Sequence, residues 1–205
     1  MIFFISDLHL SPRSPGATAL FLRFLAGRAR QAESLYILGD LFEAWIGDDD
    51  VDDTYNARIV AALRAASDAG LNISFMHGNR DFLLGAGFAR ATGGTLLAEE
   101  LVVDLHGTRT LLLHGDQLCT DDAAYQKFRA QVRDPAWQQA LLRQPLAARK
   151  HLARQLREES DAAKSGKSME IMDVNADAVV AAFRRHGVTR MIHGHTHRPA
   201  RHVHM

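Results

Sequence analysis

The stretch Ser34-Leu-Tyr-Ile-Leu-Gly-Asp40 decides how we expect this chain to fold. Its apolar and aromatic residues, 35–38, are followed at once by a glycine and a carboxylate. An apolar run this short that ends in a turn residue predicts a strand buried on both faces. Gly39 allows the backbone to turn sharply, so that Asp40 projects from the carboxyl edge of the strand. Open α/β sheets bind their ligands at that edge.

Four other segments repeat this pattern of an apolar run that ends in polar side chains. They are residues 2–9, 73–81, 110–116 and 190–197. The polar groups that follow the runs are Asp7, His9, Asn79, His114, His195 and His197. We therefore expect five strands that bring carboxylates, an amide and imidazoles to one edge. Such groups have little reason to converge unless a cation lies between them.

The composition predicts one domain without strong overall charge. Its 205 residues are 47% hydrophobic, which is enough for a sizeable core with room for an inserted subdomain. The 24 basic residues balance the 24 acidic ones, so bulk charge does not favour a polyanionic partner. The single cysteine, Cys119, excludes an internal disulfide, suits a reducing compartment and is expected to be buried. No signal peptide is visible and no apolar run approaches the roughly 18 residues of a membrane span, so we expect a cytoplasmic protein.

The segments between the expected strands show helical spacing of apolar residues. These expected helices cover residues 18–30, 55–68, 82–91 and 176–186, the last of them capped by Asn175. The alternation of strands and helices predicts a largely parallel sheet, and a hairpin at His106-Gly107 adds an antiparallel part. The acidic run 48–53 lacks the ligand spacing of a calcium loop and is expected to be a solvated loop.

Residues 120–169 differ in character from the rest of the chain. They show no strand pattern, and Pro135 and Pro145 divide them into short helical pieces. We expect a helical insertion, which we call the lid, on a core made of residues 1–119 and 170–205.

The second half of the lid is basic and amphipathic. Leu146, Leu152 and Leu156 are interleaved with cations, among them Arg149, Lys150, Arg154 and Arg157. The simpler interpretation is a solvated helical face. The functional interpretation is a cap in which the leucines cover acyl chains and the cations meet the anionic headgroups of a membrane.

The polar groups at the strand ends, taken together, predict a metal centre. One histidine or aspartate at a strand end is usually a satisfied polar side chain, but five such ends in one chain favour a functional site. Carboxylates, an amide oxygen and imidazoles without thiolates suit Mn²⁺, Fe²⁺ or Zn²⁺. The candidate ligands are too many for one ion, which predicts two ions roughly 3.5–4 Å apart that share Asp40. A water held between them would be a nucleophile at neutral pH for attack on a phosphoryl group.

The motifs that carry these groups resemble those of the calcineurin-like metallophosphoesterases over residues 7–197. They are Ile5-Ser-Asp-Leu-His9, Gly39-Asp-Leu-Phe-Glu43, His77-Gly-Asn-Arg-Asp-Phe82, His114-Gly-Asp116 and His193-Gly-His-Thr-His-Arg-Pro199. Within the family, they are most similar to the branch that acts in lipid A synthesis. This resemblance implies an α/β fold, an α+β sandwich of mixed sheets flanked by helices, with the lid over the substrate cleft. It also implies hydrolysis of the diphosphate of UDP-2,3-diacylglucosamine to UMP and 2,3-diacylglucosamine 1-phosphate, by attack on the alpha phosphorus.

The same resemblance implies two Mn²⁺ per chain and assigns residues to them. One ion would be held by Asp7, His9, Asp40 and His197, and the other by Asp40, Asn79, His114 and His195. The implied catalytic residues are Asp40, Asn79, Arg80 and His195. The implied substrate contacts come from Asn79, Arg80, Asp122, Ser160, Lys164, Lys167 and His195. Of these, Lys164 stands where many relatives have asparagine or threonine.

Arg80 follows Gly78-Asn79, where many family members have a histidine thought to protonate the leaving group. Arginine cannot donate its proton near neutral pH, but its fork can bind two phosphate oxygens. A phosphate monoester is a weak base that can leave without a proton, so we predict that Arg80 clamps the diphosphate. The alternative is that Arg80 pairs with Asp81 or Asp116 and holds the loop.

Three functions fit these motifs. The first is the lipid A diphosphatase, a monomer that contacts the cytoplasmic face of the bacterial inner membrane peripherally and binds no nucleic acid. The second is another calcineurin-like phosphodiesterase, phosphatase or nuclease; a nuclease is expected to have a basic groove and the histidine that Arg80 replaces. The third is a scaffold that keeps the fold without activity, which is expected to have lost metal ligands. Here all seven ligand positions are filled.

Overall fold

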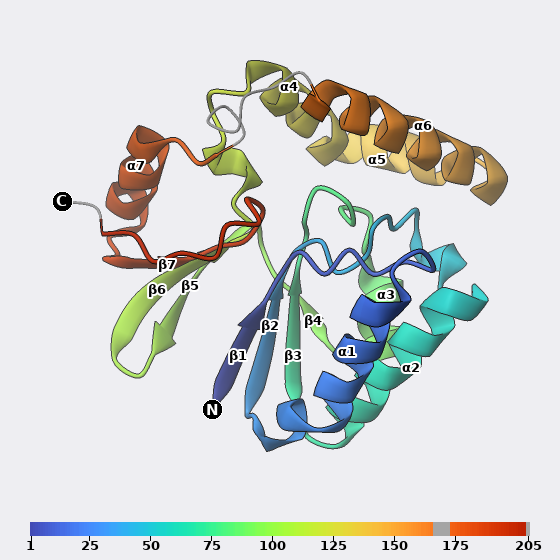
Figure 1. Ribbon diagram of the computed structural model, residues 1–205, viewed down its shortest axis with the longest axis horizontal. Coiled ribbons are helices and arrows are strands. Elements are labelled where there is room, and N and C mark those ends of the chain that lie inside the picture. The colour runs from blue at the N-terminus through green and yellow to red at the C-terminus, as the bar shows by residue number, and fades with distance from the viewer. Residues whose placement is uncertain (166–172, 204–205) are drawn as a thin grey trace.

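The structure is a computed structural model that describes residues 1–165 and 173–203. For residues 160–165 it describes the backbone only. Two β-sheets lie side by side, each with helices packed against it (Figure 1). The first sheet has the order β1-β2-β3-β4, with the strands Ile2–Ile5, Ser34–Leu38, Asn72–Met76 and Thr95–Leu96. The second has the order β5-β6-β7, with the strands Glu100–Leu105, Thr108–Leu113 and Arg190–Ile192.

The strand directions agree with those that the sequence predicts. β1 to β4 are parallel throughout, whereas β5 and β6 form the predicted antiparallel hairpin and β7 runs parallel to β6. The α/β class with mixed sheets is therefore confirmed. The sequence does not predict β4, because its two residues are too few to show a pattern.

Four helices cover the faces of the two sheets. They are α1 (Pro15–Ala26), α2 (Thr54–Asp68) and α3 (Ala86–Thr92) beside the first sheet and α7 (Ala176–His186) beside the second (Figure 1). Phe21 of α1 and Ile59 of α2 pack with Ile37 of β2 in the main core, where burial of such side chains contributes about 1.5–3 kcal/mol each. The side chain of Asn175 accepts the backbone N–H of Ala178 at 3.0 Å, which confirms the predicted cap of α7.

One predicted helix is divided in the structure. Residues 18–30 contain α1 up to Ala26 and then a separate 3-10 turn at Arg28–Gln31. The break falls at Gly27, whose N–H donates to the carbonyls at the end of α1. Glycine in a helix costs about 1 kcal/mol relative to alanine, so a helix readily ends there.

The acidic run 48–53 is solvated only in part: Asp49, Asp52 and Asp53 are exposed, and α2 begins at Thr54 directly after the run, but Asp50 is buried. The carboxylate of Asp48 accepts the backbone N–H groups of Gly85 and Phe88, both at 3.0 Å. Asp48 thus caps α3 from a distant part of the chain. This cap also fixes the start of α3, so the predicted helix 82–91 is helical from Ala86 onward.

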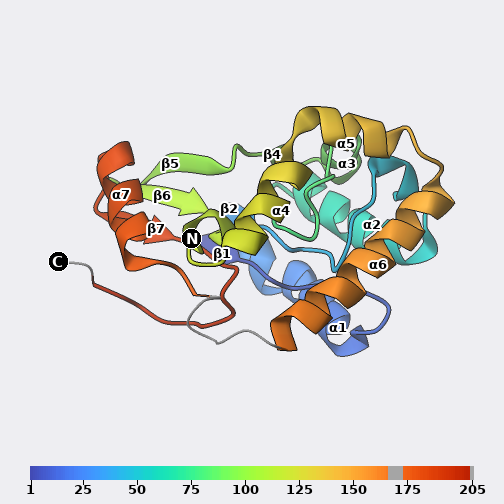
Figure 2. The same cartoon turned by 90° about the horizontal axis from the view of Figure 1, so that it is seen from above.

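Up to residue 165, where the described part of the lid ends, three helices are separated as the two prolines predict. They are α4 (Ala123–Arg133), α5 (Pro135–Leu142) and α6 (Leu146–Ser165). They lie beyond the carboxyl ends of β1 to β3, and α6 runs over α1 and α2 (Figures 1 and 2). Residues 120–169 as the limits of an inserted domain remain a prediction. In the part of the chain that the structure describes, no helix is both long and apolar enough to cross a membrane.

Helix α6 is attached to the core by cations that the functional interpretation of the sequence places at a membrane surface. Arg149 is 3% exposed and pairs with Asp49, and Lys150 pairs with Asp50 at 2.9 Å. Leu152 packs against the main core. The interpretation that Arg149 and Leu152 face a membrane is therefore wrong, because the acidic run and the core bind them.

Candidate metal centre

Backbone hydrogen bonds continue the β1–β2 register past the ends of the strands. The N–H groups of Asp7 and His9 donate to the carbonyls of Gly39 and Asp40, at 3.1 and 3.0 Å. Three candidate ligands from two distant parts of the sequence are thereby held side by side. They lie at the carboxyl edge of the first sheet, where the sequence predicts them.

Five of the seven candidate ligands have left-handed backbone conformations, with φ between 46° and 72°. They are Asp7, His9, Asp40, His195 and His197. Aspartate and histidine tolerate this conformation better than most residues, yet it costs on the order of 1–3 kcal/mol each. The sequence predicts such a turn only at Gly39, whose φ is 90°. Backbone strain is therefore concentrated at the residues whose side chains form the site.

The first group of side chains joins the loops after β1, β2 and β7. Nε2 of His9 lies 3.1 Å from Nε2 of His197 and 3.7 Å from Oδ2 of Asp40. Nε2 of His197 lies 3.6 Å from Oδ1 of Asp7. The structure thus brings together the four residues that the resemblance assigns to one ion.

The second group joins the loops after β2, β3, β6 and β7. Oδ1 of Asn79 lies 3.2 Å from Nε2 of His114 and 3.0 Å from Nδ1 of His195. Oδ2 of Asp40 is 3.8 Å from Nε2 of His114, so the same oxygen faces both groups. Asp7 also reaches this side, because ligand atoms of Asp7, Asp40 and His114 lie within 4.8 Å of one another.

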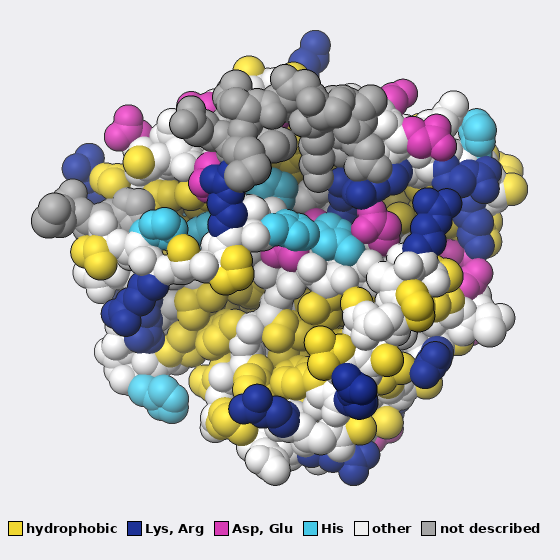
Figure 3. Space-filling view, in the orientation of Figure 1, with side chains coloured by type: hydrophobic (Ala, Val, Ile, Leu, Met, Phe, Trp, Pro, Cys, Tyr) yellow, Lys and Arg dark blue, Asp and Glu magenta, His cyan; other side chains and the backbone are white. Residues whose placement is uncertain are grey.

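These side chains have the donor chemistry of a cation site. Oδ1 of Asp7 is buried and has no hydrogen-bond partner within the described residues, which calls for an explanation such as an ion. Carboxylates, an amide and imidazoles around one centre fit divalent ions such as Mn²⁺ or Zn²⁺. Histidine and acidic side chains gather in a band across the face shown in Figure 3. The residues present therefore fit the metal ions that the motifs imply.

Burial sets the electrostatics of this site. Asp40 is 2% exposed, and burial raises the pKa of its carboxyl from 3.8 to about 6, although the nearby His114 acts in the opposite direction. Burial works to lower the pKa of His114, but neighbouring carboxylates, that of Asp40 first, raise it above 6.5. Nδ1 of His114 bonds the carbonyl of Leu38 at 2.8 Å, which turns Nε2 toward the site. A bound cation would offset the unfavourable burial of these carboxylates.

A further acid, Asp81, holds the loops around Asp40. Asp81 is fully buried, and its carboxylate accepts the backbone N–H groups of Asp40 (3.2 Å), Leu41 (2.8 Å) and Gly78 (2.8 Å). A Cβ at position 78 would collide with the carboxylate of Asp40, so only glycine fits there. The N–H of Arg80 then donates to Oδ1 of Asp40 at 2.8 Å. The sequence does not reveal this positioning role of Asp81, because its partners are backbone groups.

Replacing Asp81 with asparagine is expected to lower the free energy of unfolding by about 3 kcal/mol. Hydrogen bonds to a charged acceptor contribute about 1.5–3 kcal/mol, and the new amide would turn a donor toward backbone N–H groups. Urea unfolding of the metal-free protein measures the change. Asp68→Asn is the control, since Asp68 forms an exposed pair with Arg64 worth less than about 0.5 kcal/mol. Equal, small effects of the two changes would contradict the role of Asp81.

The first helix of the lid, α4, which we call the root of the lid, is bonded to the loop that carries His114. Asp116 is 1% exposed and accepts hydrogen bonds from the hydroxyl of Tyr125 (3.0 Å) and Nε of Arg129 (2.9 Å). The ring of Tyr125 stacks on that of His195, with 5.7 Å between their centroids. Helix α4 is thus held against the metal centre. The sequence does not single out Tyr125 or Arg129, because helical spacing alone does not show which side chains face a distant loop.

The lid residues expected to contact substrate are described only in part. Asp122 is 8% exposed and caps α4 by accepting the backbone N–H of Tyr125 at 3.1 Å. Ser160 and Lys164 lie in α6, where the structure describes the backbone alone. Lys167 lies outside the described residues. The contacts of these residues with substrate remain predictions.

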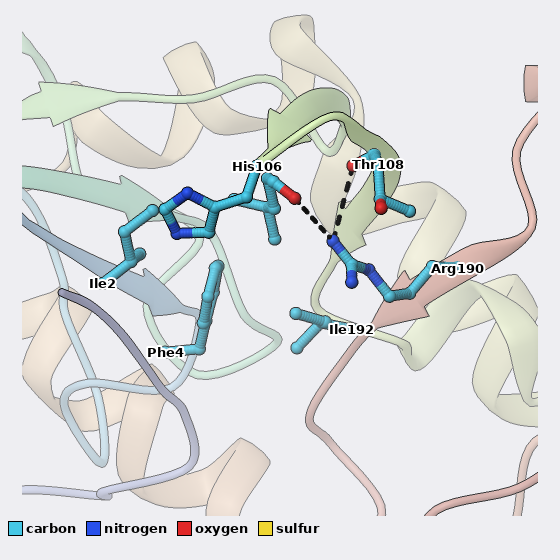
Figure 4. A pocket seen from close by; sticks show the side chains of 7 residues that line it. Ile2, Phe4, His106, Thr108, Arg190 and Ile192 are labelled. Atoms are coloured by element: carbon cyan, nitrogen blue, oxygen red, sulfur yellow. Dashed lines mark hydrogen bonds between the residues drawn. The ribbon is translucent and has the colours of Figure 1, made fainter.

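A cavity of about 430 Å³ lies apart from this site, between β1 and the second sheet. The side chains that line it are Ile2, Phe4, Leu105, His106, Thr108, Arg190 and Ile192 (Figure 4). Nη2 of Arg190 donates to the carbonyls of Leu105 and Thr108, at 3.2 and 3.4 Å, and so ties β7 to the hairpin. The lining includes none of the seven candidate ligands, so this cavity is separate from the metal centre.

Comparison with known proteins agrees with the chemistry of the site. The model of the calcineurin-like phosphoesterase family matches residues 1–199. The chain is 58% identical over 199 residues to the UDP-2,3-diacylglucosamine hydrolase of Escherichia coli O6:H1, a match that covers 97% of this chain and 82% of the relative. The protein of the same name from Shigella boydii serotype 18 has the same identity and coverage.

Solved structures give weaker similarities. The Pseudomonas putida nuclease MPE has a TM-score of 0.42 and 20% identity, and covers 56% of this chain and 54% of its own. The phosphoesterase Yfce from E. coli has a TM-score of 0.38 and 23% identity, and covers 57% of this chain and 58% of its own. Neither similarity is high enough to bear on function. The family match and the two 58% identical relatives decide the matter: the chain belongs to the calcineurin-like phosphoesterase family and is a hydrolase.

Proposed function

We propose that the protein hydrolyses the diphosphate of UDP-2,3-diacylglucosamine to UMP and 2,3-diacylglucosamine 1-phosphate in lipid A synthesis. The observation that carries this proposal is the position of Asp40, whose Oδ2 faces His9 at 3.7 Å and His114 at 3.8 Å. A carboxylate between two groups of ligands supports a two-metal hydrolytic site. The substrate is proposed because relatives that are 58% identical are named for it.

The site would hold two divalent cations, which we propose to be Mn²⁺. One set of ligands is Asp7, His9, Asp40 and His197, and the other is Asp40, Asn79, His114 and His195. When bound, the ions supply a water of lowered pKa and neutralise negative charge on a diphosphate. The chain's own part is to hold the ligands in place, with Asp81 fixing the loops around Asp40 and the carbonyl of Leu38 orienting His114.

Arg80 is proposed to bind the diphosphate beside this centre. Its backbone N–H donates to Oδ1 of Asp40 at 2.8 Å, so Arg80 lies at the edge of the candidate metal centre. A planar fork of donors in that place suits two phosphate oxygens. The remaining substrate contacts that we propose are Asn79, Asp122, Ser160, Lys164, Lys167 and His195.

Hydrolysis by the purified, Mn²⁺-loaded protein in water labelled with oxygen-18 tests the proposal. We expect UDP-2,3-diacylglucosamine to give its two products with the label in UMP, because attack on the alpha phosphorus places the new oxygen there. Bis(p-nitrophenyl) phosphate and single-stranded DNA serve as comparison substrates. Faster turnover of either would contradict the proposal, and label in the 1-phosphate would contradict the site of attack.

We also propose that the protein acts as a monomer at the cytoplasmic face of the inner membrane, because its proposed substrate carries two acyl chains. Among the cations that the sequence assigns to headgroups, Arg149, Lys150 and Arg157 pair with acids of the core, whereas Arg154 is exposed on α6. The electrostatic part of membrane binding is therefore expected to be small.

Cosedimentation with anionic and neutral vesicles measures that part. One cation near an anionic surface contributes about 1 kcal/mol, so we expect about fivefold stronger binding to the anionic vesicles at low salt. Arg154→Ala is expected to remove the difference, and Arg184→Ala, an exposed change on α7, to leave it. A preference for anionic vesicles that survives Arg154→Ala would show that another surface binds them.

A further inference from the structure

The backbone fixes Glu43 next to the metal centre. The N–H of Leu10 donates to the carbonyl of Leu41 at 2.9 Å, and the N–H of Glu43 donates to the carbonyl of Leu10 at 3.1 Å. Phe42, which is 1% exposed, packs its ring against Trp45 with 4.8 Å between centroids. With backbone bonds before it and a buried aromatic pair around it, Glu43 has little freedom to move away.

The two carboxylate oxygens of Glu43 face different parts of the molecule. Oε2 lies 3.3 Å from Nδ1 of His9, and Oε1 lies 2.8 Å from Nη1 of Arg157 in α6. The other ring nitrogen of His9, Nε2, faces His197 and Asp40. Glu43 therefore lies between the candidate metal ligand His9 and the lid helix α6, and it contacts both.

We propose that Glu43 is a positioning residue that couples lid helix α6 to the metal centre through Arg157, Glu43 and His9. A carboxylate behind a ligating imidazole fixes which ring nitrogen carries the proton, orients the ring and raises its basicity. The same carboxylate holds the lid through its second oxygen. Because coupling between two sites is reciprocal, an ion held by His9 favours the contact of α6 with Glu43 as much as that contact favours the ion. The inference rests on the proposed two-metal function.

Other ion pairs hold the lid without placing a carboxylate behind His9, and they provide the control. Glu99 pairs with Arg129 at 2.9 Å and with Arg133 at 3.0 Å, both in α4. It joins core to lid as Glu43 does, but these pairs lead to the root of the lid and not to His9. Glu43→Gln and Glu99→Gln thus make the same chemical change at two lid contacts, and only the first removes charge behind a ligand.

Calorimetric titration of the metal-free protein with Mn²⁺ tests the effect of Glu43 on metal binding. We expect Glu43→Gln to lower the affinity for one of the two ions about tenfold or more and to leave the affinity for the other within about twofold. Loss of such outer partners usually costs about 10–100-fold in metal affinity. Glu43→Ala is expected to lower the affinity for the same ion further. Glu99→Gln is expected to bind both ions like the wild type. Unchanged affinities in both Glu43 variants would overturn the proposal.

Hydrogen exchange over residues 146–159 tests the lid side. We expect Mn²⁺ to slow exchange in this part of α6 about fivefold or more in the wild type and in Glu99→Gln, and to have little effect in Glu43→Gln. Equal slowing in Glu43→Gln would overturn the coupling. A wild-type chain that bound two ions would leave the proposed function standing in either case, whereas one that bound none would overturn both.

Discussion

Replacing Asp40 with alanine is expected to leave neither metal ion tightly bound and to lower hydrolysis by about a thousandfold or more. One oxygen, Oδ2, faces Nε2 of His9 at 3.7 Å and Nε2 of His114 at 3.8 Å, so its loss removes a ligand from both groups at once. The ions contribute several kcal/mol of transition-state stabilisation, and each 1.4 kcal/mol corresponds to about tenfold in rate. Elemental analysis after dialysis gives the metal content per chain, and Asp40→Asn tests the loss of charge without a change of shape.

A change at His197 provides the comparison for Asp40. The His197 side chain is 57% exposed, and it belongs to the first group of ligands and not to the second, so His197→Ala is expected to keep one ion. Asp7 is less suitable as a single-site control, because its carboxylate approaches both groups. If Asp40→Ala still held two ions after dialysis, the shared-ligand assignment would be wrong.

Replacing Arg80 with alanine is expected to keep both ions and to lower kcat/KM for UDP-2,3-diacylglucosamine by about a hundredfold or more. Loss of one donor to a developing oxyanion typically costs 10²–10³-fold, and the guanidinium is proposed to supply two. Arg80→Lys retains the charge without the fork, so its kcat/KM is expected to lie between those of the wild type and Arg80→Ala. Steady-state kinetics with the diphosphate substrate, alongside metal analysis of each variant, measure these effects.

The same reasoning predicts which substrates the enzyme hydrolyses poorly. An alkyl phosphodiester expels a basic alkoxide, for which a general acid contributes about 10²–10⁴ in rate, and Arg80 cannot serve as that acid. We therefore expect slow turnover of simple alkyl diesters by wild type and Arg80→Ala alike. Arg90→Ala, an exposed change on α3, is the control. Near-normal kcat/KM of Arg80→Ala on the diphosphate would refute the clamp.

The strand ends could be predicted because their signal is local. In each case a short apolar run stops at a polar residue, and the carboxyl ends of parallel strands meet at one edge whatever the rest of the chain does. Asp40 and His114 were accessible to this reasoning because His114 follows such a run directly and Asp40 follows one after a single glycine. Asp81 was not, since its partners are the backbone N–H groups of loops that converge only in the folded chain.

Two charged segments illustrate why other features could not be predicted. The acidic run 48–53 and the basic part of α6 both have the composition of solvated surface, and each taken alone favours that interpretation. In the fold they meet, as Arg149 pairs with Asp49 and Lys150 with Asp50 across about a hundred positions of sequence. Nothing in either segment indicates its partner, because that information lies in the tertiary arrangement.

The left-handed backbone at five ligand positions has a consequence for how this fold can evolve. Glycine adopts that conformation without strain, and asparagine tolerates it well, so either would relieve part of a cost on the order of 1–3 kcal/mol at each position. A lineage freed from the need to bind metal would therefore relieve backbone strain at positions 7, 9, 40, 195 and 197 by the same substitutions that abolish its chemistry. Backbone strain alone would thus favour loss of these five aspartates and histidines, and descendants that keep all of them are those in which selection for the reaction has persisted.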